Sequence, residues 1–302
     1  MRNKVVYVQA HCHSRYSINK LSGEGVFHRV IWPVERQIMR LLMKSPGQLA
    51  KLARKNNVQF VVVTDHNTIP KVSGDLLIPG EEWGQTKGHA NFINLKGGID
   101  PECGFFRRHQ PLEPKDFMAA AAEARRQGAF VSINHPFKRD AWLWGEESYG
   151  LADAIEIWNG RWNEENSRAL AQWQNLLVKG NRIFCMAGND FHVNRLFDIG
   201  SQVLVFRNVS DRDSVLRNLA SGNFSIARDT RSAAVFLAGD LSYEIENYSE
   251  GLELRIISPN SSLSKINPEK EGSVRLENAE KFLRLELWKD GEPLSFTNPI
   301  FL

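Results

Sequence analysis

Short apolar runs that lead into polar side chains recur along the first two thirds of the chain. The run within residues 59–66 is continuous and rich in valine, which is typical of a strand buried on both faces, as in a parallel sheet. Runs of the same kind predict further strands within residues 6–14, 75–83, 129–137, 153–159, 182–192 and 201–206.

Helical segments separate several of these strands. Ser45 followed by Pro46 predicts an N-cap and first helical position, opening a helix through Lys55. The alanine-rich stretch 117–128 predicts a helix closed by Gly128. Further helices are expected at 35–44, at 163–179 before Gly180, and after a capping box of Ser210 with Asp213, ending at Gly222. Alternation of strand and helix is the signature of a parallel sheet or an α/β barrel.

The pattern changes after about Phe224. Strand-like segments follow one another without intervening helices, and several of them alternate apolar and polar residues. We therefore expect an α/β unit at residues 1–224 and a small β-rich domain at residues 225–302. The β-rich part carries no chemical motif, and a lid, a dimer surface in a homo-oligomer and a structural brace all stay open for it.

Composition narrows the class of protein. The chain has 302 residues, of which 42% are apolar, enough for a sizeable core. A net charge of +3 gives no case for a nucleic-acid partner but is compatible with an anionic small-molecule substrate. Three widely spaced cysteines argue against a disulfide framework. No signal-peptide pattern and no membrane-spanning run of roughly 18 apolar residues occurs. We expect a soluble, cytoplasmic protein that uses neither membrane nor nucleic acid.

Metal-ligand side chains stand at the ends of the predicted strands. His11 and His13 should face one side of their strand and Cys12 the other, because successive side chains alternate. Six of the eight histidines occupy such positions. The candidate ligands are His11, His13, His66, Glu82, His89, His135, Asp190 and His192. Imidazole with carboxylate suits Zn, Mn or Fe. The set exceeds what one ion needs, so two or three divalent ions are expected, with Glu82 as a bridging carboxylate.

Several other residues have roles that the sequence leaves open. Asp65 either orients a ligand imidazole or caps a loop. Glu156 either faces the site or pairs with an arginine inside the fold. The candidates for substrate binding near the rim are Trp158, Asn159, Arg161 and Arg195, with Lys138 of similar standing. Surface solvation is the alternative for each lone cation, and helix packing is the alternative for neighbouring tryptophans.

The ordered motifs H-C-H-S, T-D-H-N, P-G-E-E, G-H, N-H-P and G-N-D-F-H resemble those of PHP-domain (polymerase and histidinol phosphatase) metallohydrolases. The elements T-D-H-N, G-H-A-N, E-I-W-N-G and T-N-P-I-F-L are most similar to the CehA/McbA-like branch. The resemblance covers most of the chain. It implies a distorted (β/α)7 barrel with a di- or trinuclear metal site, and hydrolysis, most often of phosphate esters.

The resemblance also implies roles for the candidate ligands. His11 and His13 would bind one ion together with Glu82 and Asp190, and His192 matches the last ligand of the D-x-H motif. The family pattern G-x-E selects Glu82 rather than its neighbour Glu81. His66 would hold a second ion, and His89 with His135 would serve a third position that Glu82 shares. Glu82, Asp190 and Asp65 are the carboxylates expected to take part in catalysis.

One position departs from the family pattern. Family members commonly carry an aspartate five residues after the second histidine of H-x-H, and here that position is Ile18. An apolar side chain cannot bind a metal, so the second ion would lack one protein ligand. Two ions are then expected rather than three, or three with one held loosely.

The function expected from these observations is metal-dependent hydrolysis, by a phosphoesterase that acts on a small phosphorylated substrate through metal-activated water. A carbamate, amide or carboxylic ester hydrolase on the same metals is the alternative enzyme, and tryptophans near the strand ends would favour it. A weakened metal- or ligand-binding module is the alternative of another class, for which Ile18 is the supporting feature.

Overall fold

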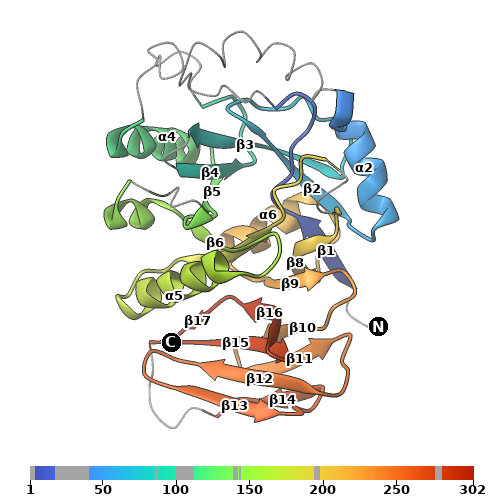
Figure 1. Ribbon diagram of the computed structural model, residues 1–302, viewed down its shortest axis with the longest axis vertical. Helices are drawn as coiled ribbons and strands as arrows, with labels where there is room; N and C mark the ends of the chain where they lie inside the picture. Colours follow the sequence, from blue (N-terminus) through green and yellow to red (C-terminus); the bar gives the residue numbers. More distant parts are fainter. Residues whose placement is uncertain are drawn as a thin grey trace.

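The computed structural model describes residues 4–17, 41–85, 88–99, 112–138, 142, 144–193, 198–275 and 281–302 (Figure 1). Its main feature is a long mixed sheet in the order β13-β12-β15-β16-β9-β8-β1-β2-β3-β4-β5-β6-β7. The first nine strands are β1 (Val5–Gln9), β2 (Phe60–His66), β3 (Leu77–Gln85), β4 (Gly88–Ile93), β5 (Phe130–Asn134), β6 (Ala154–Asn159), β7 (Phe184–Gly188), β8 (Ser201–Arg207) and β9 (Ser225–Asp229).

The sheet is not the (β/α)7 barrel that the resemblance implied. Pairs β1–β2, β2–β3, β5–β6 and β6–β7 are parallel, but β3–β4, β4–β5, β1–β8 and β8–β9 are antiparallel. Only residues 86–87 separate β3 from β4, and a connection so short permits only an antiparallel hairpin. The prediction of a mixed α/β fold is confirmed, whereas a closed barrel is wrong.

Among the described strands the sheet is open, yet the segment after its end strand β7 meets the segment after its central strand β1. Among the described strands, no ladder joins β7 to β8 or to β1. An isolated parallel bridge between Cys12 and Phe191 joins the segments that follow β1 and β7. The amide of His13 also donates to the carbonyl of Phe191 at 2.8 Å. This contact brings the polar residues after β1 beside those after β7 without a closed barrel.

The described helices are α2 (Pro46–Lys55), α4 (Pro114–Arg126), α5 (Glu164–Val178), α6 (Arg212–Ser221) and the 3-10 helix η2 (Glu146–Leu151). Helix α2 lies across the molecule from α4 and α5 (Figure 1). Ser45 caps α2 as predicted, in a capping box with Gln48. The cap of α6 was predicted one residue too early: Asp211, not Ser210, is the N-cap and pairs with Ser214. The helix predicted at 35–44 lies mostly outside the described residues.

None of the described helices is long and apolar enough to cross a membrane.

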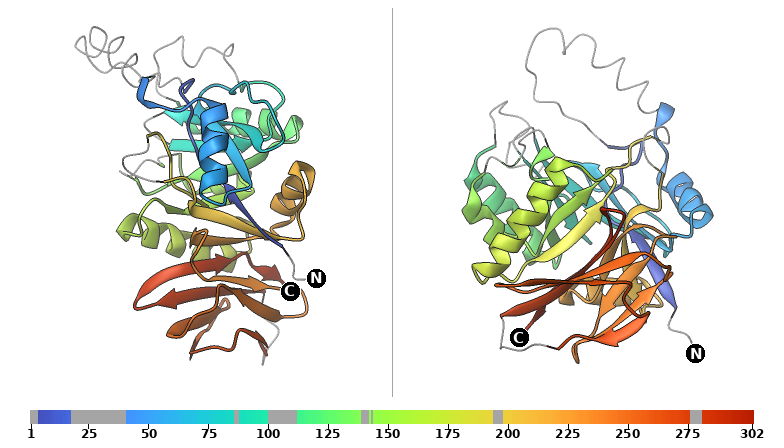
Figure 2. Two further views of the ribbon diagram at one scale, coloured as in Figure 1. Left: turned by 90° about the vertical axis from the view of Figure 1, so that its right-hand side faces the viewer. Right: turned by 60° about the horizontal axis from the view of Figure 1, so that its bottom comes forward.

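Residues after β9 form only strands among those described: β10 (Ala234–Leu237), β11 (Ser242–Glu246), β12 (Leu252–Ile257), β13 (Ser262–Ile266), β14 (Glu271–Ser273), β15 (Phe282–Lys289), β16 (Glu292–Thr297) and β17 (Ile300–Phe301). They make the lower layer in Figure 1 and the foreground in the right-hand view of Figure 2. β9 pairs with β8 on one side and β16 on the other, so hydrogen bonding runs across residue 225. The division into two domains stays a prediction.

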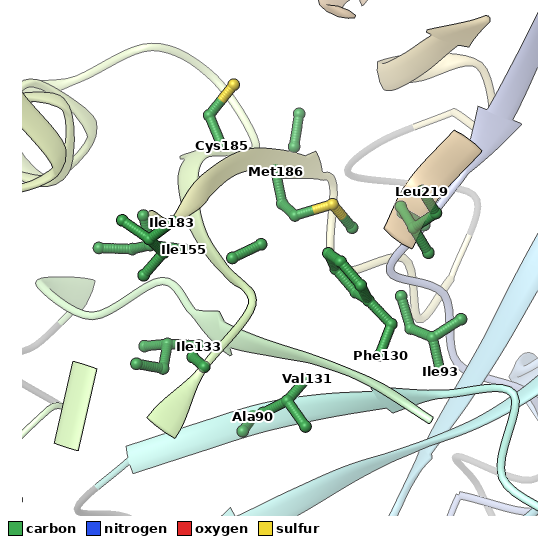
Figure 3. Packing of buried hydrophobic residues seen from close by; sticks show 14 of the residues in the cluster. Ala90, Ile93, Phe130, Val131, Ile133, Ile155, Ile183, Cys185, Met186 and Leu219 are labelled. Atoms are coloured by element: carbon green, nitrogen blue, oxygen red, sulfur yellow. The ribbon is translucent and has the colours of Figure 1, made fainter. Parts of the chain in front are cut away.

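The core beneath the candidate site is apolar. Phe130, Met186, Leu219 and Ile93 lie together in one apolar cluster between the strands and α6 (Figure 3). Cys185 is fully buried, and burial raises the pKa of its thiol, as expected for a core cysteine rather than a nucleophile. Full burial of each large side chain stabilises the fold by about 2 kcal/mol. This packing gives the strand ends a rigid base.

Candidate metal centre

The chain leaving β1 places two imidazoles on one side and a thiol on the other. His11 and His13 are buried with ring centroids 5.3 Å apart. Cys12 is fully buried in the separate apolar cluster that contains Val61 and Phe191. This is the alternation expected of an extended chain. Both imidazoles therefore point to the place where the ends of β2, β3 and β7 converge.

Glu82 lies at the centre of the histidines and is fully buried. Its carboxylate oxygens lie 2.9–3.3 Å from ring nitrogens of five imidazoles, those of His11, His13, His66, His89 and His135. The neighbouring Glu81 faces the other way, and its Oε2 accepts from the amide of Ile99 at 2.9 Å. Strand alternation thus brings Glu82, and not Glu81, into the cluster.

Asp190 and His192 close the cluster from the chain after β7. Oδ1 of Asp190 lies 3.1 Å from Nε2 of His13, 3.5 Å from Nε2 of His11 and 3.4 Å from Nδ1 of His192. Asp190 has φ 51° and His135 has φ 26°, both in the left-handed region that non-glycine residues rarely adopt. Such backbone strain gathers at functional sites, where surrounding contacts hold it in place.

Buried polar atoms face one another in this cluster without hydrogen-bond partners among the described residues. They include Nε2 of His11, Nε2 of His13, Oε2 of Glu82 and Oδ1 of Asp190. An unsatisfied buried polar atom costs about 1–3 kcal/mol, so four that converge need a common partner. Ligand atoms of these four residues lie within 4.8 Å of one another. The residues fit a divalent metal ion.

Three further groups of three meet the same distance limit. They are His13 with His66 and His192, His66 with Glu82 and His89, and His11 with His135 and Glu156. Every predicted ligand takes part in at least one group. Four residues, His11, His13, His66 and Glu82, each belong to two groups. These shared members place the groups next to one another, as in sites that hold more than one ion.

The carboxylates and imidazoles shift each other's ionisation. Burial by itself raises the pKa of Glu82, but the imidazoles of His66, His11 and His89 outweigh it and hold that pKa well below its usual range. For Asp190, burial also raises the pKa, and nearby imidazoles led by His11 lower it further than burial raises it. Both carboxylates are therefore ionised and available as ligands at neutral pH.

The imidazoles divide into two kinds. Burial lowers the pKa of His13, but its contacts with Asp190 and Glu82 outweigh burial and raise the pKa to about 9. For His66 and His192, burial outweighs the neighbouring carboxylates, and it lowers the pKa of His66 to about 4 and that of His192 to about 3. Neutral imidazole is the form that binds metals, so His66 and His192 are ready as ligands, while His13 must first lose a proton.

Glu156 contacts the ring nitrogen of His11 that faces away from Glu82. Its Oε1 lies 3.1 Å from Nδ1 of His11, on the opposite side of the ring from Glu82. Its Oε2 accepts from the amide of His135 at 3.0 Å and from the Asn159 side chain at 2.9 Å. A carboxylate on the rear nitrogen of a ligand histidine fixes the ring and its tautomer. From the sequence, Glu156 could either face the site or pair with an arginine. In the structure it contacts His11 and His135.

Gly188 makes the contact between His11 and Glu156 possible. A Cβ at this position would lie 2.4 Å from Cβ of His11 and 2.5 Å from Oε1 of Glu156. Both distances are shorter than any normal contact, so only glycine fits without moving one of the two residues. The glycine two residues before Asp190 is thus part of the site's construction.

Asp65 is buried but does not face the cluster. Its two oxygens accept from the amide of Ser14 at 2.5 Å and from the Ser14 hydroxyl at 2.6 Å. Burial raises the pKa of Asp65 to about 6, and the Ser14 contacts oppose that rise. The hydrogen bonds of Asp65 tie the turn after His13 to β2, and the charge of His13 also lowers its pKa. A part for Asp65 in catalysis or in orienting an imidazole stays a prediction.

The predicted substrate-binding residues have different locations. Asn159 and Arg161 line a cavity of about 470 Å³ beside His135. Trp158 does not: it is 1% exposed and packs on Trp162 and Phe296, so its predicted role at the rim is wrong. The strand bulges between Glu156 and Trp158, which breaks the simple alternation. Arg195 and Ile18 lie outside the described residues.

Of the tryptophans that would have favoured carbonyl chemistry, those in the described ranges are used in packing, and Trp32 lies outside these ranges. Trp83, Trp142 and Trp144 cluster with Phe117, with ring centroids 4.8–6.3 Å apart. No described tryptophan lines the cavity beside His135. Besides the imidazole of His135, the aromatic side chain in the described wall of this cavity is Phe137.

Sequence reasoning gave little weight to three residues that touch the cluster. Lys138 donates to Oδ2 of Asp190 at 2.7 Å, and Asn134 donates to Oε1 of Glu82 at 3.0 Å. The Ser17 hydroxyl lies 3.3 Å from Nδ1 of His13 and accepts from the amide of His66. The sequence signal that could have found two of them is their nearness to a predicted ligand: Asn134 precedes His135, and Lys138 follows it by three residues.

No protein-family model matches the sequence, and no curated protein matches it. Solved structures do. A crystal structure of a two-domain protein containing a predicted PHP-like metal-dependent phosphoesterase, from Bacteroides vulgatus ATCC 8482, aligns over 99% of this chain and 96% of its own, with a TM-score of 0.53 and 15% identity. The two chains therefore share a fold over nearly their whole lengths.

Two other structures align less well. PsfC from Pseudomonas syringae PB-5123 has a TM-score of 0.42 and 14% identity, covering 73% of this chain and 89% of its own. The lesion-specific endonuclease PfuEndoQ from Pyrococcus furiosus has a TM-score of 0.45 and 15% identity, covering 79% of this chain and 60% of its own.

Proposed function

We propose that the protein is a metal-dependent hydrolase of the PHP type that cleaves a phosphate ester of a small molecule. The observation that carries the proposal is the position of Glu82, a buried carboxylate surrounded by five imidazoles. Its Oε2 and the Nε2 atoms of His11 and His13 are buried without hydrogen-bond partners among the described residues. The shared fold with a protein described as containing a PHP-like phosphoesterase supports it. The CehA/McbA-like branch remains a finer assignment within this proposal.

The residues divide into those that hold metal and those that hold the ligands. His11, His13, Glu82 and Asp190 would hold one ion, and His66, His89, His135 and His192 would complete a second or third position with Glu82. A divalent ion of the Zn, Mn or Fe kind supplies a Lewis acid that polarises the phosphoryl group and lowers the pKa of the attacking water. Glu156 fixes the ring of His11, and Asn134 fixes the carboxylate of Glu82.

The cation beside Asp190 favours an anionic substrate. Lys138 is partly exposed, and its ammonium lies at the border between the cluster and the adjoining cavity. Preorganised positive charge stabilises a phosphoryl group most where its negative charge develops. Metal-activated water is the nucleophile in this proposal, which has no covalent protein intermediate.

The experiment is release of p-nitrophenol by Mn- or Zn-loaded protein from an aryl phosphate and, in parallel, from an aryl carboxylic ester. We expect chelator-sensitive hydrolysis with preference for the phosphate. His11→Ala and Asp190→Ala should abolish it, while Asp75→Ala, at an exposed aspartate before β3, should leave it intact. Preference for the carboxylic ester, or full activity in the two ligand variants, would refute the proposal.

A further inference from the structure

A cavity adjoins the metal centre on the side of β5 and β6. Its volume is about 470 Å³, within the roughly 300–1,000 Å³ typical of small-molecule sites. Its lining includes His135 and Glu156, which contact the metal centre, together with Lys138, Asn159, Arg161 and Asn166. A substrate whose phosphoryl group reaches the metal centre therefore has room here for its alcohol part.

Lys138 stands where the cavity meets the centre. Its Nζ lies 2.7 Å from Oδ2 of Asp190 and 3.5 Å from Oδ1 of Asn159. The other oxygen of Asp190, Oδ1, faces His11 and His13. Asp190 can thus bind an ion through Oδ1 while Oδ2 accepts a hydrogen bond from Lys138. The ammonium then stays between the reacting group and the cavity.

Arg161 supplies a second positive charge to the cavity from a fixed loop. The buried Asn166 side chain donates to the carbonyl of Arg161 at 2.9 Å and to that of Asn159 at 3.3 Å, and it accepts from the amide of Asn159. The side chain of Arg161 is exposed. Within the described part of the chain, no carboxylate lies within ion-pair distance of its guanidinium. The loop presents the cation without a described ion-pair partner, at a position that also borders a neighbouring cavity whose wall includes Asp198 and Asp229.

Two carboxylates also belong to the cavity wall. Both oxygens of Glu156 are committed, one to His11 and the other to the His135 amide and Asn159. Glu165, on the first turn of α5, is partly exposed and has a contact of its own. Glu156 is therefore turned toward the metal ligands, which leaves Lys138 and Arg161 as the cations available to a bound molecule.

We propose that this cavity selects phosphate esters whose alcohol part carries a second anionic group, with Lys138 at the phosphoryl end and Arg161 at the second anion. The inference rests on the proposed phosphoesterase function for the first anion. It adds a substrate class: phosphorylated molecules with a carboxylate or a second phosphate, in preference to neutral alcohol esters. Charged hydrogen bonds to guanidinium give the discrimination.

The test compares phenyl phosphate with 4-carboxyphenyl phosphate, two esters of similar size, by phosphate release from the Mn-loaded full chain. We expect kcat/KM to favour the carboxylated ester by about fivefold to tenfold, as one charged contact provides. In Arg161→Gln the ratio should fall to near one. In the matched control Arg54→Gln, at an exposed arginine of α2 outside the cavity, the ratio should be that of wild type.

Equal rates for the two esters in the wild type, or an unchanged ratio in Arg161→Gln, would overturn the inference while leaving phosphoesterase activity established. If neither ester is hydrolysed, the proposed function fails, and the selectivity of the cavity for a second anion is then tested by ligand binding. Calorimetric titration with phenylphosphonate and 4-carboxyphenylphosphonate should show tighter binding of the carboxylated compound, lost in Arg161→Gln. Equal affinities would overturn the inference.

Discussion

Nδ1 of His11 lies 3.1 Å from Oε1 of Glu156, while Nε2 of the same ring lies 3.2 Å from Oε1 of Glu82. One imidazole nitrogen therefore points into the cluster and the other is held from behind. Because Nε2 of His11 faces Glu82 and Asp190 while Nδ1 faces Glu156, Glu156 acts on the site through His11 rather than beside it as a ligand. This relationship joins β6 to the end of β1.

Replacing Glu156 by glutamine should weaken metal binding without removing it. The amide cannot match the charge that holds His11, and loss of such a partner typically costs about 10- to 100-fold in metal affinity. Activity should recover as the metal concentration is raised. Titration of Mn- or Zn-dependent activity measures this, with Glu269→Gln, at an exposed glutamate, as the control. A metal dependence identical to wild type would contradict the positioning role.

Gly188→Ala should disrupt the same contact by steric overlap. The added Cβ would lie 2.4 Å from Cβ of His11, so the ring or the strand must move. Overpacking of this kind costs about 1–3 kcal/mol of stability, and metal affinity should fall with it. Thermal unfolding and metal titration report the two effects.

The matched control is Gly47→Ala in α2, where an added Cβ meets nothing within 4 Å. That change should be neutral or raise stability by about 0.5–1 kcal/mol, because alanine favours helix over glycine. A Gly188→Ala protein as stable and as metal-avid as Gly47→Ala would show that the close approach to His11 is not required.

Metal binding should release protons at neutral pH. Burial lowers the pKa of His13, but Asp190 and Glu82 raise it to about 9, so the metal-free protein holds a proton there at pH 7. A metal ion must displace that proton, and metal affinity should therefore rise as pH rises toward 9.

The raised pKa of His13 also makes the folding stability of the metal-free protein depend on pH. The folded-state pKa of His13 is raised, so its contribution to stability is complete below about 6.5 and is lost as pH rises through about 9. Calorimetry in two buffers of different ionisation enthalpy counts the protons released by Zn binding at pH 7. Zero release, or an affinity independent of pH, would exclude a protonated His13.

Lys138→Met should reduce hydrolysis of aryl phosphate while the metal content stays that of wild type. The ammonium contacts Asp190 through Oδ2 and not the histidines, so its removal spares the ligand set but takes positive charge from the phosphoryl end of the cavity. Loss of one preorganised charge should lower kcat/KM by about tenfold or more. Lys138→Arg should restore part of the rate. Loss of bound metal in Lys138→Met would instead indicate a structural role.

Much of the site could be predicted because period-two alternation and strand ends are local properties. The spacing of His11 and His13 places them on one face, and the choice of Glu82 over Glu81 agrees with the direction of their side chains. Partners far along the chain leave no such local signal. Asp65 was open in the sequence because its partner, Ser14, lies 51 residues earlier.

The parts of the fold that were missed have similar causes. The alternation of strand and helix left a parallel sheet and an α/β barrel open, and the resemblance to PHP-domain proteins implied a distorted (β/α)7 barrel. The two-residue connection between β3 and β4 instead forces an antiparallel pair and changes the sheet's course. Trp158 was placed at the rim by counting residues, and the bulge beside Glu156 turns it into the core instead. Short connections and bulges decide such details, and neither changes the hydrophobic pattern.

The most direct test of a metal centre built around Glu82 is the metal content of the chain after reconstitution with Zn or Mn and removal of free ion, measured for the wild type and Glu82→Ala. The wild type should retain two or three ions. Glu82→Ala should lose most of them, because five imidazoles lose their shared carboxylate while the apolar core stays in place. A wild-type chain that retains no ion, or a folded Glu82→Ala chain that retains the full number, would contradict the account.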